Sequence, residues 1–289
     1  MRTDDEIALI ANAMRHDIIA MLGEAGTGHP GGSLSATDIM ATIFYSGLLG
    51  WDASDPKNPE RDRFVLSKGH AAPALYALLM RQGFLSRDEL GTLRKLGSRM
   101  QGHPDCHKAP GVEVCTGSLG QGLSVSAGMA LGLKLDAART GEPVRRVFCL
   151  LGDGELQEGQ NWEAAMFAAH RGLDNLVAIV DWNNLQIDGN VSSVCAVAPL
   201  KEKFSAFGWH VIETDGHDVA AVRAALEEAV AHEGEPVAIV AKTVKGKGVS
   251  FMEDQVSWHG NAPSAEQTEQ ALAEIDAARE ALAASVKEA

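Results

Sequence analysis

The sequence of 289 residues is poor in basic residues relative to acidic ones, and it has no long apolar run. Lysine and arginine number 25 against 39 aspartates and glutamates, so the formal net charge is −14 at pH 7. This balance disfavours a nucleic-acid or membrane-surface partner, both of which select basic patches. No segment approaches the roughly 20 apolar residues of a membrane span, and the acidic start does not resemble a signal peptide. We therefore expect a cytoplasmic protein.

Cysteine is also scarce. The four cysteines, Cys106, Cys115, Cys149 and Cys195, lie far apart in the sequence and show no Cys-x-x-Cys spacing. Such a pattern favours unpaired thiols in a reducing compartment over a disulfide or a zinc site. Low-complexity tracts and internal repeats are absent as well, and 45% apolar residues with 22% charged ones indicate a folded globular chain.

The pattern of apolar residues predicts an α/β fold, with a parallel sheet flanked by helices. Short, β-branched apolar runs alternate with helical segments in the second half of the chain, as in strands buried between helices. Strands are expected over residues 147–151, 175–181, 209–213 and 236–243. Helices are expected over residues 4–22 (ended by Gly23), 35–47, 70–82, 86–96, 121–140, 158–171, 200–207, 218–233 and 264–287. We expect residues 1–262 to form one domain and residues 263–289 to form its C-terminal helical tail.

Two polar motifs follow neighbouring predicted strands. Gly152-Asp153-Gly154 comes directly after the strand over 147–151, and Asn183-Asn184 follows the next strand about thirty residues later. The carboxyl ends of parallel strands are where open sheets bind ligands. Aspartate and asparagine oxygens suit a hard divalent cation, which can also take a backbone carbonyl and a diphosphate. The helix after Gly154 would add amide dipoles facing the phosphate.

This spacing is that of thiamine-diphosphate enzymes, and the chain closely resembles the transketolase family. Further motifs of that family occur in the family's order and span nearly all of the sequence. They are G-H-P-G-G, S-K-G-H, G-H-P, T-G-S-L-G-Q-G, D-W-N-N-L-Q-I-D-G and the lysine-rich K-T-V-K-G-K-G stretch that leads to W-H-G, at residues 28–32, 67–70, 102–104, 116–122, 181–189 and 242–260. The resemblance implies a thiamine-diphosphate-binding fold.

The resemblance also implies the ligands of the cofactor. Asp153, Asn183 and the carbonyl of Leu185 would bind Mg²⁺, with Ca²⁺ or Mn²⁺ as other candidates. Gly154 would donate its N–H to the diphosphate. The other residues expected to bind the cofactor are Gly117, Ser118, Leu119, His70, His259 and Glu158.

Two of these expectations have alternatives in the residues themselves. Glu158 is either an acid favoured by the N-terminal dipole of its helix or, as in the family, an acid at the subunit interface. The lysines of the K-T-V-K-G-K-G stretch face either solvent or phosphate.

Four histidines lie beside glycine in loop-like contexts. By resemblance, His29 and His259 contact substrate hydroxyls and assist proton transfer, and His103 binds the first hydroxyl of the donor. His70 and His259 would also contact the cofactor phosphates. Histidine suits these roles because it titrates near neutral pH.

Family members that are single chains are about twice as long as this one, because they carry a pyrimidine-binding domain and a C-terminal domain as well. We therefore expect an N-terminal subunit of a split transketolase, inactive alone, which forms a heterotetramer with a second subunit that carries those two domains. The complex would move a two-carbon ketol unit from a ketose phosphate to an aldose phosphate.

Other functions stay open. A catabolic transketolase for a branched or sulfonated sugar would have the same half-site. From other classes, a non-catalytic thiamine-diphosphate-binding partner and a Mg²⁺-dependent phosphohydrolase using Asp153 and Glu158 are conceivable, although the latter has no use for four loop histidines. Deoxyxylulose-phosphate synthase fits less well, since that family lacks the wording of the T-G-S-L-G-Q-G and N-N-L-Q-I-D-G motifs.

Overall fold

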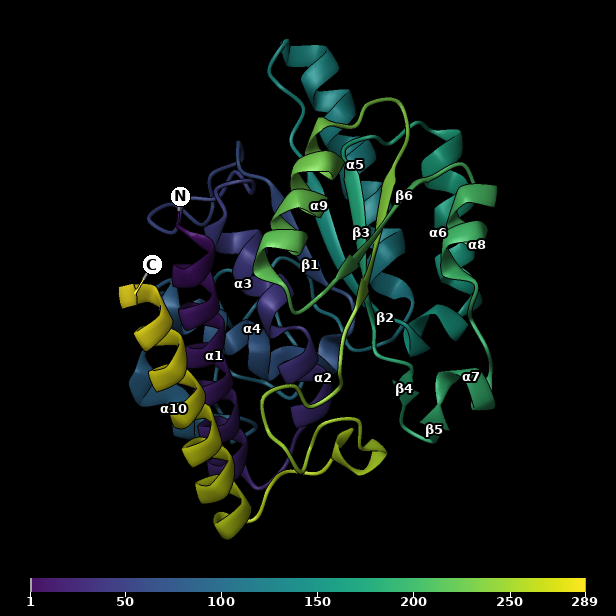
Figure 1. The fold of residues 1–289 in the computed structure, drawn as a ribbon. Helices are drawn as coiled ribbons and strands as arrows, with labels where there is room; N and C mark the ends of the chain where they lie inside the picture. Colours follow the sequence, from purple (N-terminus) through teal and green to yellow (C-terminus); the bar gives the residue numbers. More distant parts are fainter. Residues whose placement is uncertain (1, 289) are drawn as a thin grey trace.

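Five parallel strands form the centre of the computed structural model, which describes residues 2–288 (Figure 1). Their order in the sheet is β1-β2-β3-β7-β6. The predicted α/β class with a parallel sheet between helices is confirmed. The strands are β1 (Arg63–Leu66), β2 (Val147–Gly152), β3 (Leu176–Trp182), β6 (His210–Asp215) and β7 (Val237–Lys242).

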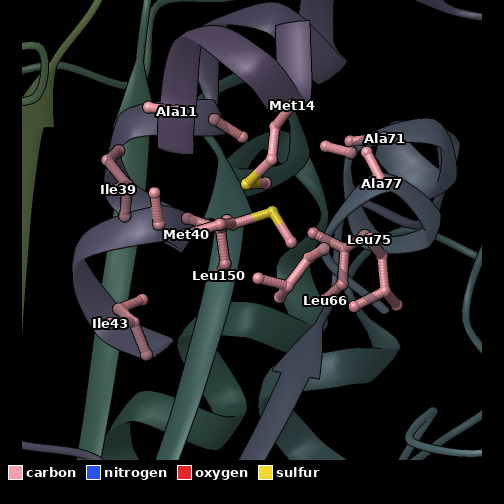
Figure 2. Packing of buried hydrophobic residues seen from close by; sticks show 14 of the residues in the cluster. Ala11, Met14, Ile39, Met40, Ile43, Leu66, Ala71, Leu75, Ala77 and Leu150 are labelled. Atoms are coloured by element: carbon pink, nitrogen blue, oxygen red, sulfur yellow. The ribbon is translucent and has the colours of Figure 1, made fainter. Parts of the chain in front are cut away.

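Helices cover both faces of this sheet, because successive side chains of the buried strands point to opposite sides. In β2, Phe148 and Leu150 join the apolar core on one face, whereas Cys149 and Leu151 join the core on the other. Figure 2 shows part of the first core, where Met14 and Met40 lie beside Leu150. The first core packs under α1 (Asp4–Ala25), α3 (Thr37–Tyr45), α4 (Ala72–Arg81) and α9 (Val219–Ala231), and the second under α5 (Gln121–Thr140), α6 (Gly159–His170) and α8 (Leu200–Ala206).

The C-terminal helix α10 (Ala265–Glu288) runs alongside α1 (Figure 1). Asn12 Nδ2 donates to the carbonyl of Ile275 at 3.1 Å, and Ile275 is itself buried. Gly23 lies so close to Thr268 that an added Cβ would approach its Oγ1 to 2.5 Å. The tail therefore packs on this chain, while the division at residue 262 stays a prediction.

That contact corrects the expected end of the first helix. Gly23 does not end α1, which continues to Ala25 and is capped by Gly26 in the left-handed region (φ 63°). Gly23 instead allows the close approach of α10. The helix expected over residues 35–47 corresponds to α3, and a further short helix that was not predicted, α2 (Pro30–Ser35), precedes it and meets it at Ala36.

The helix expected over residues 86–96 is wrong in kind and length. The segment forms a short 3₁₀ helix, η2 (Arg87–Thr92), although its capping pair Ser86 and Glu89 makes both expected hydrogen bonds. Arg94 has a φ of 62°, which a continuing α-helix cannot contain. Three strands go beyond those that the sequence predicts, because each is too short to give a pattern. One is the four-residue edge strand β1, and the others are β4 (Leu185–Gln186) and β5 (Gly189–Asn190), which form a separate antiparallel pair.

The sequence suggests that the four cysteines are remote from one another, but two of them meet in the structure. All four are free thiols, but the loop over residues 104–116 folds back so that Cys106 Sγ and Cys115 Sγ lie 3.3 Å apart. Among the described residues, no helix is long and apolar enough to cross a membrane.

Candidate active site

Polar side chains from four strands meet at one edge of the sheet. Lys68, Asp153, Asn183 and Lys245 lie just beyond the carboxyl ends of β1, β2, β3 and β7, respectively, the edge where open α/β sheets bind ligands. All four are buried and line a cavity of about 230 Å³. Its other lining residues are His70, Leu119, Gly152, Gly154, Glu155, Gln157, Glu158, Leu185, Gln186, Ile187 and His259.

Asp153 is a buried carboxylate that forms no ion pair with any residue in the described part of the chain. Its Oδ1 accepts from the N–H of Gly154 at 2.8 Å, and its Oδ2 accepts from the N–H of Asn184. Burial, reinforced by the nearby charge of Asp181, raises the pKa of Asp153 to about 6. A cation placed beside this carboxylate would offset that cost, so the residue fits the predicted role of metal ligand.

Asn183 and Leu185 present further oxygens on the same side. Asn183 Oδ1 accepts from the N–H of Leu185 at 3.1 Å, and the carbonyl of Leu185 accepts from Lys245 Nζ at 3.0 Å. The ammonium group thus binds the carbonyl that was expected to bind metal. Burial, together with the charge of Lys68, lowers the pKa of Lys245 to about 8. The lysines of the K-T-V-K-G-K-G stretch do not all face the same way. Lys245 faces the ligand cavity, whereas Lys242 is exposed to solvent.

A second buried carboxylate, Asp181, lies at the end of β3 and was not predicted as a site residue. Lys68 forms an ion pair with its Oδ2, Ser35 donates to the same oxygen at 2.6 Å, and Thr243 donates to Oδ1. Burial alone would raise the pKa of Asp181, but Lys68 and the two hydroxyls reverse this and hold it below the ordinary value. Nothing local in the sequence signals this group, since Asp181 and Ser35 are 146 residues apart.

Glu155 is another residue that the sequence does not single out. Its buried carboxylate accepts from the N–H groups of Gly120 and Gly152, both at 3.0 Å, and from the hydroxyl of Ser67. It thereby ties the Gly-Asp-Gly turn to the loop over residues 117–120 and to the end of β1. Its position in the first turn of a helix gives no sign of this burial.

The four predicted histidines cluster around His29. The ring centroid of His29 lies 5.5 Å from that of His70, 5.7 Å from that of His259 and 6.3 Å from that of His103. His70 and His259 stack with centroids 5.1 Å apart, and both line the cavity. His29 and His103 therefore form the outer part of one continuous imidazole cluster.

The surroundings of these imidazoles lower their pKa values and so favour the neutral form. Burial lowers the pKa of His29 to about 4, helped by the charge of Arg94, and that of His259 to about 3, helped by Lys245. Burial and the charge of Lys68 hold the pKa of His70 well below its usual range. Partial burial and the charge of Arg94 lower the pKa of His103. Neutral rings can accept or donate a hydrogen bond to hydroxyls, as the predicted roles require.

The glycine-rich loop brings the remaining predicted residues to the same edge. Gly117 has a φ of 133°, and an added Cβ would approach the ring of His103 to 2.8 Å. Leu119 lines the cavity, whereas Ser118 is exposed and is not among its lining residues. Glu158 also lines the cavity but is exposed, as either alternative for this residue allows.

Comparison with known proteins agrees with this architecture. Residues 7–281 match the family model described as "Transketolase, thiamine diphosphate binding domain". The chain is 41% identical over 266 residues to the 6-deoxy-6-sulfo-D-fructose transketolase subunit SqwG of Clostridium sp. (strain MSTE9), covering 92% of this chain and 94% of that protein. It is 39% identical over 271 residues to one of the apulose-4-phosphate transketolase subunits of Phocaeicola vulgatus, covering 94% of each.

The similarity extends to solved structures. A transketolase from Campylobacter jejuni superposes with a TM-score of 0.89 at 34% identity, over 96% of this chain and 43% of the other. The chain therefore spans less than half of that transketolase, but nearly the full length of the two subunits. It belongs to the transketolase family and corresponds to the thiamine-diphosphate-binding N-terminal part, as predicted.

The cavity meets the requirements of the cofactor that this family binds. Among the described residues, none forms a hydrogen bond with the buried Nδ1 of His259, so a polar ligand could satisfy this atom. Asp153 and Asn183 supply the hard oxygens that Mg²⁺ prefers. At Gly154, an added Cβ would approach that of Gln186 to 2.9 Å, so only glycine leaves the backbone free here.

Proposed function

We propose that this chain is the diphosphate- and metal-binding subunit of a two-chain, thiamine-diphosphate-dependent transketolase. With its partner it would transfer a two-carbon ketol unit from a ketose phosphate to an aldose phosphate. The observation that carries the proposal is the cavity at the strand ends, where Asp153, Asn183 and Leu185 face the stacked pair His70 and His259. The near full-length similarity to named transketolase subunits supports the two-chain organisation.

The cofactor, when bound, supplies a nucleophilic carbon that attacks a carbonyl and then holds the resulting electron pair. This chain's own residues hold and orient it. Asp153, Asn183 and the Leu185 carbonyl would bind Mg²⁺, and Gly154, His70 and His259 would contact the diphosphate. Lys245 adds a positive charge within the same cavity.

The histidine cluster would act on substrate hydroxyls. His103 lies at its outer, exposed end and would bind the first hydroxyl of the donor. His29, between His103 and the cavity, and His259 would assist proton transfer. The lowered pKa values of His29 and His259 suit a base that starts neutral.

A partner subunit would complete the site. By family resemblance, a glutamate that activates the cofactor lies in the pyrimidine-binding domain, together with most contacts to the sugar phosphate. Large apolar side chains are exposed beside the cavity and on α5 and α6, as a docking surface for that domain requires. They are Leu119, Ile187, Val125, Met166 and Phe167. We propose a heterotetramer of two copies of each subunit; a cytoplasmic location stays a prediction.

The identity of the sugar substrate is a separate question within this proposal. The two subunits compared above are named for a sulfonated and a branched sugar, so a catabolic transketolase for such a sugar is the alternative. Both functions share this half-site. Assaying the two-chain complex with ordinary, branched and sulfonated ketoses separates them by relative kcat/KM.

The experiment that tests the proposal compares the isolated chain with the complex. Calorimetry on the isolated chain should detect thiamine diphosphate only when Mg²⁺ is present, and no ketol transfer should occur. The complex purified with its partner should transfer ketol units in a cofactor-dependent reaction. His103→Ala should keep cofactor binding and lower donor kcat/KM by about tenfold, the value of one hydrogen bond of about 1.4 kcal/mol.

His170→Ala is the matched control, since His170 is exposed at the end of α6 and lies outside the imidazole cluster. Equal donor kinetics in both variants would refute the role of His103. Cofactor binding without activity in any complex would favour the non-catalytic binding partner. Phosphate release that needs no thiamine diphosphate would favour the phosphohydrolase.

A further inference from the structure

Four potential metal ligands lie close together outside the cofactor cavity. Asp105, Cys106, His107 and Cys115 each bring one ligand atom within 4.8 Å of the others. They sit at the neck of the loop over residues 104–116, which closes where the N–H of Thr116 donates to the carbonyl of Pro104 at 3.3 Å. Asp105, Cys106 and His107 lie on the first limb of this loop, and Cys115 lies opposite them on the second limb.

The contacts within this cluster centre on the two sulfur atoms. Cys106 Sγ and Cys115 Sγ are 3.3 Å apart, and the N–H of Cys106 donates to Cys115 Sγ at 3.4 Å. Asp105 Oδ1 lies 3.5 Å from Cys115 Sγ and accepts from the N–H of His107 at 2.8 Å. Backbone donation to sulfur and carboxylate orients both groups, so the cluster is arranged before any ligand binds.

We propose that Asp105, Cys106, His107 and Cys115 bind one Zn²⁺ ion. Two thiolates, one imidazole and one carboxylate are a donor set that tetrahedral zinc uses, and soft thiolates distinguish the site from the oxygen ligands at Asp153 and Asn183. Binding requires both thiols and the imidazole in their deprotonated forms, so Zn²⁺ would displace one proton from each cysteine.

The geometry favours a metal over a disulfide. With Zn–S bonds of about 2.3 Å, two sulfurs on a tetrahedral ion lie about 3.8 Å apart, whereas a disulfide requires about 2.0 Å. The observed 3.3 Å is closer to the metal value. A disulfide would also leave the convergence of Asp105 and His107 on the same point without a role.

The site would clamp a loop that carries functional residues at both ends. His103 precedes the cluster by two residues, and Gly117, whose backbone lies against the His103 ring, follows Cys115 by two. A bound ion would therefore restrain His103 and the glycine-rich loop together. This consequence rests on the proposed function, whereas ion binding itself does not.

The test is a titration of the reduced full-length chain with Zn²⁺ in competition with a chromophoric chelator. Mg²⁺ and thiamine diphosphate are present in excess, so that the cofactor cavity and its histidines are occupied. One equivalent should bind. Cys106→Ser and Cys115→Ser should each weaken binding by more than about 100-fold, beyond the effect typical of outer-shell changes. His107→Ala and Asp105→Asn should weaken it by at least about tenfold.

Cys195→Ser is the matched control, because Cys195 is an exposed thiol remote from the cluster in sequence, and it should bind Zn²⁺ as the parent does. Co²⁺ provides an independent readout, since thiolate ligation gives an intense sulfur-to-cobalt charge-transfer band. That band should disappear in the two cysteine variants and persist in Cys195→Ser.

Several results would overturn the proposal. One is unchanged Zn²⁺ affinity in the Cys106→Ser, Cys115→Ser double variant, which would assign the ion to the histidine cluster. Another is the absence of a thiolate band with Co²⁺. A third is a reduced chain that binds no Zn²⁺ but forms a Cys106–Cys115 disulfide on treatment with peroxide. Circular dichroism of each variant checks that the fold is retained, so loss of binding is not misread. None of these outcomes depends on ketol-transfer activity.

Discussion

Asp153 and Asp181 lie at the ends of neighbouring strands, are both buried, and yet have opposite surroundings. Asp181 is enclosed by a lysine and two hydroxyls that all donate to it. Asp153 receives only backbone N–H groups, and the ammonium of Lys245, which lines the same cavity, donates to a carbonyl instead. Their pKa values are shifted in opposite directions accordingly.

This difference in partners distinguishes a carboxylate that stabilises the structure from one that is suited to bind a ligand. A buried charge whose partners all come from the protein has no need that a ligand could meet. A buried charge that lacks a charged partner in the protein destabilises the fold, and such groups are found at functional sites where a bound cation supplies the missing partner. The comparison therefore supports the proposed metal binding by Asp153 and indicates that Asp181 stabilises the structure of the same edge.

The largest expected effect is on stability at Asp181. Asp181→Asn leaves Lys68 buried opposite a neutral amide, so we expect the free energy of unfolding to fall by about 3–5 kcal/mol, as when one member of a buried ion pair is removed. Urea unfolding of the chain without cofactor measures this. If Asp153→Asn were equally destabilising, the contrast between the two carboxylates would be wrong.

Asp153→Asn should affect ligand binding instead. The change removes the charge of the proposed metal ligand, so Mg²⁺-dependent affinity for thiamine diphosphate should fall by more than about 100-fold, above the usual cost of outer-shell changes. Stability should change by less than about 1 kcal/mol, because relief of the buried charge offsets the loss of one acceptor for a backbone N–H. Calorimetry and urea unfolding on one preparation test both parts. Asp136→Asn, at an exposed acid on α5, is the control.

The pH dependence of the same residue gives a smaller effect of defined sign. The pKa of Asp153 is raised in the folded chain, from 3.8 to about 6. Its contribution to stability is therefore complete below about pH 4 and is lost as pH rises through about 6. Metal binding needs the carboxylate and should follow the opposite trend, weakening about tenfold from pH 7.5 to pH 5.

Asp153→Asn serves as the reference for this measurement, because it removes the titration and leaves the other groups in place. Subtracting its stability curve from that of the parent isolates the contribution of Asp153. A difference curve that rises with pH between 4 and 6 would contradict the raised pKa.

The sequence predicts those parts of the site that are local in the chain. Asp153 and Asn183 each follow a recognisable apolar strand, so their meeting at one edge follows from parallel topology. The contacts of Asp181 with Ser35 and Lys68, and of Glu155 with Ser67, are not predictable in this way, since these partners are 88 to 146 residues away and depend on how loops fold over the edge. Cys106 and Cys115 are only nine residues apart, but a loop without periodicity does not reveal its closure.

The fold shows the same limit. Long periodic helices and β-branched strands are predicted to within a few residues, whereas the segment after Ser86 is not. There the capping pair correctly signals a helical start, and the left-handed Arg94 soon afterwards prevents an α-helix from continuing. Start signals are side-chain chemistry and are visible in the sequence. The backbone conformation that stops a helix at a non-glycine residue is set by tertiary contacts.

The smallest effect concerns Lys245. We expect it to weaken the binding of Mg²⁺ alone but to strengthen the binding of Mg²⁺ together with thiamine diphosphate. Its Nζ donates to the Leu185 carbonyl, the oxygen that we expect to bind Mg²⁺, so the ammonium and the metal compete for it. In Lys245→Met, Mg²⁺ alone should bind up to about fivefold more tightly, the value of one net hydrogen bond of about 1 kcal/mol. Binding of the Mg²⁺–thiamine diphosphate pair should weaken by a similar factor, because the diphosphate loses a buried cation.

Calorimetry with Mg²⁺ alone and with the pair distinguishes these contributions. Lys247→Met is the matched control, since Lys247 is partly exposed and pairs with Glu253 at 3.5 Å. If Lys245→Met weakened both ligands, Lys245 would support the metal site rather than compete for it. Opposite signs would show that Lys245 leaves the carbonyl when the metal arrives and is then free to neutralise the diphosphate. Asp153 and Lys245 would then be the two charges of this edge that the ligand, and not the protein, satisfies.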